Sequence, residues 1–123
     1  MPTVEMERRQ VVVIGAGPSG AIAAALLKRK GHDVLMIERQ HFPRFSIGES
    51  LLSHCLDFVE EAGMLEAVNA AGFQLKNGAA FAWGEHYSAF DFGDTFGNGK
   101  PTTFQVQRAD FDNAGGAGGT AEL

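Results

Sequence analysis

Apolar residues in the first third of the chain change from a strand pattern to a helix pattern and back. The β-branched run 11–14 predicts a buried strand, and the helix formers 21–27 predict a helix directly after it. Basic residues at 28–30, followed by Gly31, mark the end of that helix. The run 33–38, which is apolar from 34 to 37, then predicts a second strand, so the order is typical of a βαβ unit with parallel strands.

Three glycines in Gly-x-Gly-x-x-Gly spacing connect the first strand to the helix. They are Gly15, Gly17 and Gly20, with Pro18 and Ser19 before the last one. In this motif the first glycine permits a tight turn, the second lets the backbone approach a phosphate, and the third lets helix and strand pack closely. The helix N-terminus adds N–H donors and the positive end of a dipole. The motif in this context predicts a site for the pyrophosphate of a dinucleotide.

Glu38 falls at the carboxyl end of the second predicted strand. A carboxylate at this place, about 20 residues after the glycines, accepts hydrogen bonds from ribose hydroxyls and repels a 2′-phosphate. This favours FAD or NAD over NADP. The alternative is an ordinary βαβ unit in which Glu38 is only a solvated residue at a strand end.

The rest of the chain predicts two helices, then strands, then one more helix. Helical spacing of apolar residues predicts a helix over 49–62 that stops at Gly63, and a short helix is expected over 64–71. Alternation predicts strands over 73–84 and 87–92, with a turn at 84–86, and a further strand over 103–107. A helix is expected to start over 108–113, and the glycine-rich residues 114–123 are expected to be flexible.

Two stretches after Glu38, Phe-Pro-Arg at 42–44 and Ile-Gly-Glu-Ser at 47–50, resemble a segment of flavin-dependent halogenases. Related FAD-dependent monooxygenases and geranylgeranyl reductases share it. The resemblance implies that Arg39 lies by the adenosine and Arg44 near the cofactor, where guanidinium groups donate to phosphate or carbonyl oxygens. The alternative for both arginines is solvated surface charge.

The same resemblance implies that residues 46–50 run beside the isoalloxazine ring of FAD. The cofactor contacts expected there are Ile47, Gly48 and Ser50, and a glycine allows the backbone to approach a flat ring. Farther on, Gln107 and the Arg-x-x-Phe-Asp stretch that starts at Arg108 are similar to the place where this superfamily returns to the flavin domain. Gln107 and Arg108 are therefore candidate cofactor contacts, although acidic residues after an arginine also suit any helix start.

The stretch from Lys76 to Gly84 resembles the Lys-x-Gly-Ala-x-Phe-x-Trp-Gly pattern of flavin halogenases that act on phenols or on carrier-bound groups. In those enzymes the lysine is catalytic, so the resemblance implies that Lys76 is the catalytic residue. An ammonium group between flavin and substrate can capture hypohalous acid and deliver the halogen to one carbon. The alternative is an ordinary lysine on a strand edge, where it discourages edge pairing.

The resemblance covers residues 10–113 and implies an α/β fold with a Rossmann-like FAD-binding βαβ unit and the start of a substrate-side β-sheet. The expected divisions are a disordered extension at 1–9, the FAD-binding unit with its helices at 10–72, strands of the substrate-side sheet at 73–107, and a return helix at 108–113. The resemblance reaches only the amino-terminal part of such enzymes. We therefore expect an incomplete domain, with 114–123 as a linker, a frameshifted end or an artificial junction.

The implied parent enzyme uses reduced FAD, oxygen and halide on a small aromatic or pyrrole substrate, in some members bound to a carrier protein. A separate flavin reductase is the partner expected for a halogenase. Two alternatives stay open. One is an FAD-dependent hydroxylase or a geranylgeranyl-reductase-like enzyme in which Lys76 has no chemistry, and the other is a catalytically inert nucleotide-binding fragment.

Composition narrows the possible partners. The net charge is −5 without a basic run, which disfavours nucleic acid and anionic membranes as partners. One cysteine and four scattered histidines provide no metal-ligand spacing, so no metal site is expected. A single thiol also suits a reducing cytoplasm.

Overall fold

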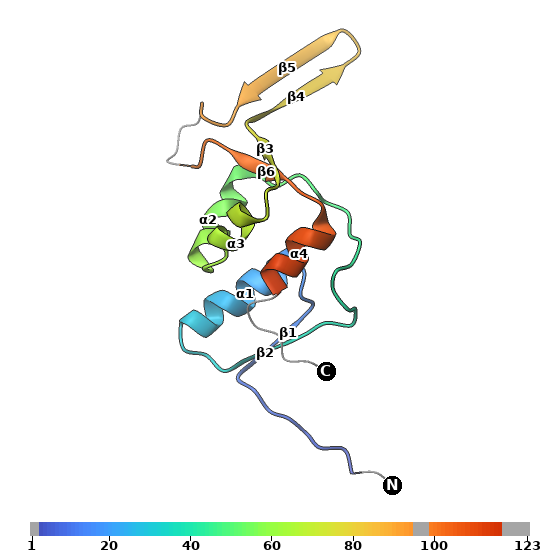
Figure 1. The fold of residues 1–123 in the computed structure, drawn as a ribbon, viewed down its shortest axis with the longest axis vertical. Coiled ribbons are helices and arrows are strands. Elements are labelled where there is room, and N and C mark those ends of the chain that lie inside the picture. The colour runs from blue at the N-terminus through green and yellow to red at the C-terminus, as the bar shows by residue number, and fades with distance from the viewer. Residues whose placement is uncertain (1–2, 95–98, 117–123) are drawn as a thin grey trace.

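The computed structural model describes residues 3–94 and 99–116, and its first three elements form the predicted βαβ unit (Figure 1). Strand β1 (Val11–Ile14) leads into helix α1 (Pro18–Arg29) and then strand β2 (Val34–Ile37). The strands are parallel, with Val11 opposite Val34. The prediction of a parallel βαβ unit is confirmed, and Glu38 directly follows β2.

Helices α2 (Ser53–Glu61) and α3 (Leu65–Ala70) come next, and α2 starts later than expected. The predicted start at residue 49 is wrong because residues 49–51 are extended along strand β6 (Thr103–Gln105). The Leu51 N–H donates to the Phe104 carbonyl at 3.1 Å, and the Val106 N–H donates to the Glu49 carbonyl at 2.7 Å. These bonds to a distant strand replace the helical bonds that the local pattern favours.

The described strands of the second half form two separate two-stranded sheets. Strand β3 (Gln74–Lys76) pairs antiparallel with β6, while β4 (Gly78–Trp83) and β5 (His86–Asp91) form a hairpin. The predicted hairpin is confirmed. Strands β3 and β6 lie within the range 73–107 expected for the substrate-side sheet, and in the described residues they pair with each other rather than with the hairpin. Figure 1 shows the hairpin extending away from the helices.

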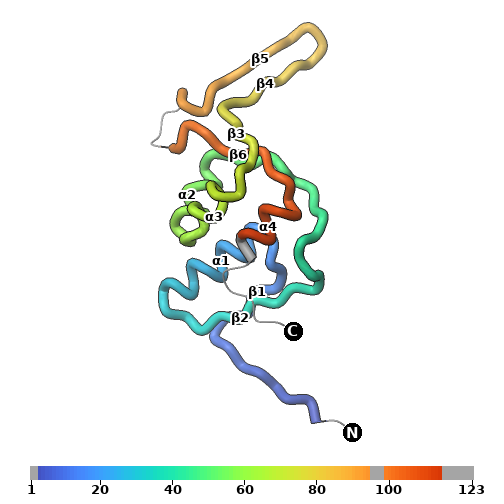
Figure 2. Tube along the Cα trace, viewed as in Figure 1, coloured from blue at the N-terminus to red at the C-terminus, as the bar shows by residue number. Residues whose placement is uncertain are grey.

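Helix α4 (Arg108–Gly116) begins where it was predicted but ends later. Residues 114–116, expected to belong to a flexible tail, are helical, and the remaining tail residues lie outside the described part of the chain. At the other end, residues 3–9 carry no helix or strand and extend away from the body of the molecule (Figure 2). Buried residues near the middle of α4, such as Phe111, hold it against its neighbours.

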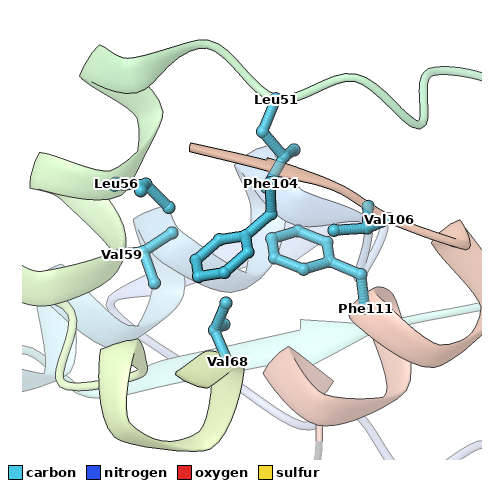
Figure 3. Close-up of a cluster of buried hydrophobic side chains, with 7 residues drawn as sticks. All are labelled: Leu51, Leu56, Val59, Val68, Phe104, Val106 and Phe111. Carbon is cyan, nitrogen blue, oxygen red and sulfur yellow. The ribbon is translucent and has the colours of Figure 1, made fainter. Parts of the chain in front are cut away.

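The hydrophobic core lies among α2, α3, β6 and α4 (Figure 3). Its buried members are Leu51, Leu56, Val59, Val68, Phe104, Val106 and Phe111. Phe73 packs edge-on against Phe104 and Phe111, with ring centroids 6.5 and 6.0 Å away. The core therefore fixes the position of α4, whose first turn lies near the start of α1.

None of the helices in the described ranges is long and apolar enough to cross a membrane.

Candidate functional site

The three motif glycines occupy three different environments at the turn between β1 and α1. Gly15 has a φ of +102°, a left-handed conformation that favours glycine. A Cβ on Gly20 would lie 1.9 Å from the Gly15 carbonyl oxygen, so helix and turn touch through backbone atoms there. A Cβ on Gly17 would meet only side-chain nitrogens, at 3.6 Å and 3.8 Å. Gly15 and Gly20 thus shape the turn, and Gly17 keeps one face of it open.

The amino terminus of α1 presents backbone donors at this open face. The helix begins at Pro18, and its cap residue Gly17 supplies no side-chain hydrogen bond. The Ala21 N–H donates to the Gly17 carbonyl at 2.9 Å, whereas the N–H groups earlier in a helix have no intrahelical acceptor. Proline suits the first position because it has no N–H to satisfy. The turn therefore offers the N–H groups of Ser19 and Gly20 and the positive end of the helix dipole to an anion.

Glu38 is tied to the same turn by its carboxylate. One oxygen, Oε2, accepts the Ala16 N–H at 2.8 Å, and the other, Oε1, accepts the Gln40 N–H at 3.1 Å. Arg44 lies 3.4 Å from Oε2. Hydrogen bonds from Ala16 and Gln40, followed by the charge of Arg44, hold the pKa of the Glu38 carboxyl below its ordinary value. The carboxylate is therefore ionised at neutral pH, and its remaining lone pairs can accept ribose hydroxyls.

Two guanidinium groups lie beside Gly17. A Cβ on Gly17 would lie 3.6 Å from Arg44 Nη2 and 3.8 Å from Arg108 Nη2. Arg44 is further held by a 3.1 Å hydrogen bond to the Gln40 side chain and by the ring of Phe42, whose centroid is 5.0 Å away. The structure therefore brings two predicted residues, remote from each other in the sequence, to the predicted phosphate turn.

Arg108 is fixed by Asp112, a residue that the sequence analysis did not single out. Arg108 Nε and Nη2 donate to the two Asp112 oxygens at 2.7 and 3.0 Å, and Nη1 donates to the Ile47 carbonyl at 2.6 Å. These hydrogen bonds to Asp112 raise the pKa of the Arg108 guanidinium above its ordinary value. The spacing of four residues on one helix is the sequence signal that could have identified the pair.

An open groove of about 370 Å³ lies beside the loop 45–50, in the range of small-molecule sites. The loop lines it together with Gln105. Gly48 has a φ of +98°, and a Cβ there would lie 3.2 Å from Arg108 Nη1. The groove and the phosphate turn therefore share Arg108 as a neighbour.

Lys76 reaches the edge of this groove. Its Nζ donates a hydrogen bond to the hydroxyl of Ser50, one of the groove residues, and lies 5.6 Å from the centroid of the Phe92 ring. The side chain is half-buried at the end of β3. Lys76 is thus directed at the loop that the resemblance places beside a flavin.

Two other candidates stand apart from these contacts. Arg39 is exposed at the surface. Gln107 is also exposed, and its carbonyl accepts the N–H groups of Asp110 and Phe111 at 3.1 and 3.0 Å, so its visible role is to cap α4. Among the residues that the structure describes, no group of three histidine, cysteine, aspartate or glutamate side chains could hold a metal ion.

Comparison with known protein families identifies the chain. The family described as tryptophan halogenase matches residues 10–114, which is more than half of the chain. The chain belongs to the tryptophan halogenase family. The family resemblance derived from the sequence is thereby confirmed.

Curated members of the family act on different substrates. The chain is 41% identical over 103 residues to a tryptophan 2-halogenase of Chondromyces crocatus, covering 84% of this chain and 19% of that enzyme. It is 38% identical over 109 residues to a 1H-pyrrole-2-carbonyl-[peptidyl-carrier protein] brominase of Pseudoalteromonas luteoviolacea, covering 89% of this chain and 26% of the brominase. The chain thus spans about a fifth to a quarter of the length of these relatives.

Solved structures of related proteins have the same fold as this chain. A flavoprotein/dehydrogenase from Cytophaga hutchinsonii matches with a TM-score of 0.83 and 50% identity, covering 89% of this chain and 27% of that protein. The myxobacterial chondrochloren halogenase CndH, a variant of the FAD-dependent halogenases, matches with a TM-score of 0.78 and 35% identity, covering 87% and 25%. The α/β fold is therefore that of the amino-terminal part of FAD-dependent halogenases.

Proposed function

We propose that this chain is the FAD-binding amino-terminal segment of a flavin-dependent halogenase in which Lys76 delivers the halogen. The described residues fit the cofactor. Backbone donors, together with Arg44 and Arg108, suit a pyrophosphate, and Glu38 suits the adenosine ribose. The isoalloxazine ring would then lie in the groove along residues 45–50.

The contact between Lys76 and Ser50 carries the proposal, because it joins the lysine to a residue that lines the groove. When bound, reduced FAD supplies the oxygen activation that turns halide into an electrophilic halogen. The Ser50 hydroxyl and the Phe92 ring hold the Lys76 Nζ at the groove edge. An ammonium in that place donates hydrogen bonds to hypohalous acid and directs the halogen to one substrate carbon.

A segment exchange tests this proposal in a complete enzyme. Residues 10–114 would replace the matching segment of the Chondromyces crocatus tryptophan 2-halogenase, and halogenation would be followed with reduced FAD, oxygen and halide. We expect Lys76→Ala to retain FAD but to lower the turnover number by at least about a hundredfold, since a positioned proton donor contributes on that scale. Lys28→Ala, which removes an exposed lysine of α1, is the control. Equal turnover in both variants would refute the role of Lys76.

The substrate proposed for the parent enzyme is an aromatic or pyrrole group, free or bound to a carrier protein. The named activities of the tryptophan and pyrrole relatives support this choice. A separate flavin reductase as partner and a cytoplasmic location complete the proposal.

A second candidate function is an FAD-dependent hydroxylase or reductase, which the 50% identity to a flavoprotein/dehydrogenase favours. In such an enzyme NADPH reduces the bound FAD without a partner reductase, and Lys76 has no chemistry. Reduction of the exchanged enzyme's flavin by NADPH alone, with no halogenated product, would support this candidate over the halogenase.

A further inference from the structure

Asp112 is a buried carboxylate that accepts hydrogen bonds from Arg108. Its side chain is 0% exposed, and each of its two oxygens accepts one hydrogen bond from the Arg108 guanidinium. A parallel pair of this kind fixes the plane of the guanidinium as well as its position. Breaking a buried ion pair is costly, because the remaining charge has no partner. The pairing with Asp112 therefore constrains the Arg108 side chain strongly.

The hydrogen bonds of Arg108 show where its remaining donors point. A guanidinium has five N–H groups, and in the described part of the chain two donate to Asp112 and one donates to the Ile47 carbonyl. One N–H remains on Nη1 and one on Nη2. These two nitrogens are the ones beside Gly48 and Gly17, at 3.2 and 3.8 Å from where a Cβ would lie. The nitrogens that carry the uncommitted donors therefore lie between the phosphate turn and the loop 45–50.

We propose that Asp112 is a positioning residue for diphosphate recognition: it holds Arg108 so that two N–H donors face an anion seated at the Gly17 turn. The inference rests on the proposed cofactor function and adds a residue to it. The Asp112 side chain is 0% exposed, and both of its oxygens accept hydrogen bonds from Arg108. Its effect on binding is therefore exerted through the orientation of the guanidinium.

This role predicts the opposite sign from simple charge counting. Asp112 places a negative charge near an anion site, so its removal should strengthen the attraction of a diphosphate if only net charge matters. If orientation matters, Asp112→Asn weakens binding, because the amide NH₂ replaces an acceptor and faces a guanidinium donor. The direction of the change thus distinguishes positioning from electrostatics.

The test uses the 123-residue chain, labelled with ¹⁵N and titrated with ADP and with adenosine while amide chemical shifts are recorded. We expect Asp112→Asn to raise the ADP dissociation constant about tenfold, the scale of a lost charge-assisted hydrogen bond, and to leave the adenosine dissociation constant unchanged. Asp110→Asn is the matched control, because it removes the same charge from an exposed position on the same helix. We expect it to leave both dissociation constants within twofold of the unsubstituted chain.

The outcomes separate this inference from the function on which it rests. If the unsubstituted chain binds ADP and Asp112→Asn binds it equally or more tightly, the positioning role is refuted and the proposed function stands. Equal weakening of ADP and adenosine also refutes the role, because it indicates a general structural loss. If neither ADP nor adenosine changes the amide chemical shifts of the unsubstituted chain, the proposed cofactor function fails, and this inference fails with it.

Discussion

The close contact between Gly20 and Gly15 predicts that Gly20→Ala destabilises the fold, although alanine is the better helix former. Alanine in place of glycine inside a helix gains about 1 kcal/mol in propensity. Against this, the new Cβ would lie 1.9 Å from the Gly15 carbonyl oxygen and 3.0 Å from its carbon. Both atoms belong to the backbone, so no side chain can rotate away to relieve the clash. The turn itself must move by about 1 Å.

The cost of that movement exceeds the gain in propensity. Overpacking costs about 1–3 kcal/mol, and the upper end applies where backbone is struck. The shift also strains the 2.7 Å hydrogen bond from the Gly15 N–H to the Ile37 carbonyl, worth about 1 kcal/mol. We expect a net loss of about 3 kcal/mol in the free energy of unfolding. For an m value of about 2 kcal/mol per molar, the midpoint of urea unfolding falls by about 1.5 M.

Gly17→Ala is the matched control for this prediction. A Cβ on Gly17 would meet its nearest neighbours at ordinary contact distances of 3.6 and 3.8 Å, and the φ of −67° suits any residue. We expect the free energy of unfolding to change by less than about 1 kcal/mol. ADP binding should nevertheless weaken, because the methyl group occupies the space between two guanidiniums. A Gly20→Ala chain as stable as the unsubstituted one, or equal losses in both variants, would refute the reasoning.

Two further predictions concern the Glu38 carboxylate and the core. Folding lowers the pKa of the Glu38 carboxyl, so the ionised carboxylate stabilises the fold. This stabilisation is fully present at pH values above the ordinary glutamate pKa, and it is lost as the pH falls through the pKa of the folded state. Glu38→Gln should therefore make the midpoint of urea unfolding less dependent on pH in the acidic range. Phe111→Ala should cost about 3–5 kcal/mol in thermal or urea unfolding, because the side chain is buried. Phe58→Ala, at a residue that is 43% exposed, should cost far less, and equal losses would contradict the core assignment.

Local sequence patterns were sufficient for the βαβ unit. Its strands and helix are each marked by their own residues, and glycine spacing identifies the turn, so no distant partner was needed to recognise it. The same holds for the hairpin, whose two strands are joined by the turn that starts at Gly84, with a φ of +57°. The candidates Arg44 and Arg108 came from the family resemblance, and the structure brings both to the turn.

Errors arose where pairing with a distant segment decided the structure. Apolar residues at 51, 52, 55 and 56 suit a helix from residue 49, yet Leu51 bonds to Phe104 across the sheet. The strand predicted over 73–84 is likewise divided, because its first part, β3, pairs with the distant strand β6. Local periodicity contains no information about such partners, because the same residues satisfy a helix or a strand edge until the partner is present.

The missed residue, Asp112, shows why the site depends on the core. Arg108 and Asp112 lie on α4, the same helix that places Phe111 among the buried aromatic rings. Since the orientation of α4 is set by that packing, the guanidinium reaches Gly17 only when β6 and the helices α2 and α3 are in place. In the sequence, the glycine turn has the pattern of a diphosphate site that is complete by itself. The structure adds a cation carried by a helix about ninety residues later, so anion recognition and core formation in this chain are coupled.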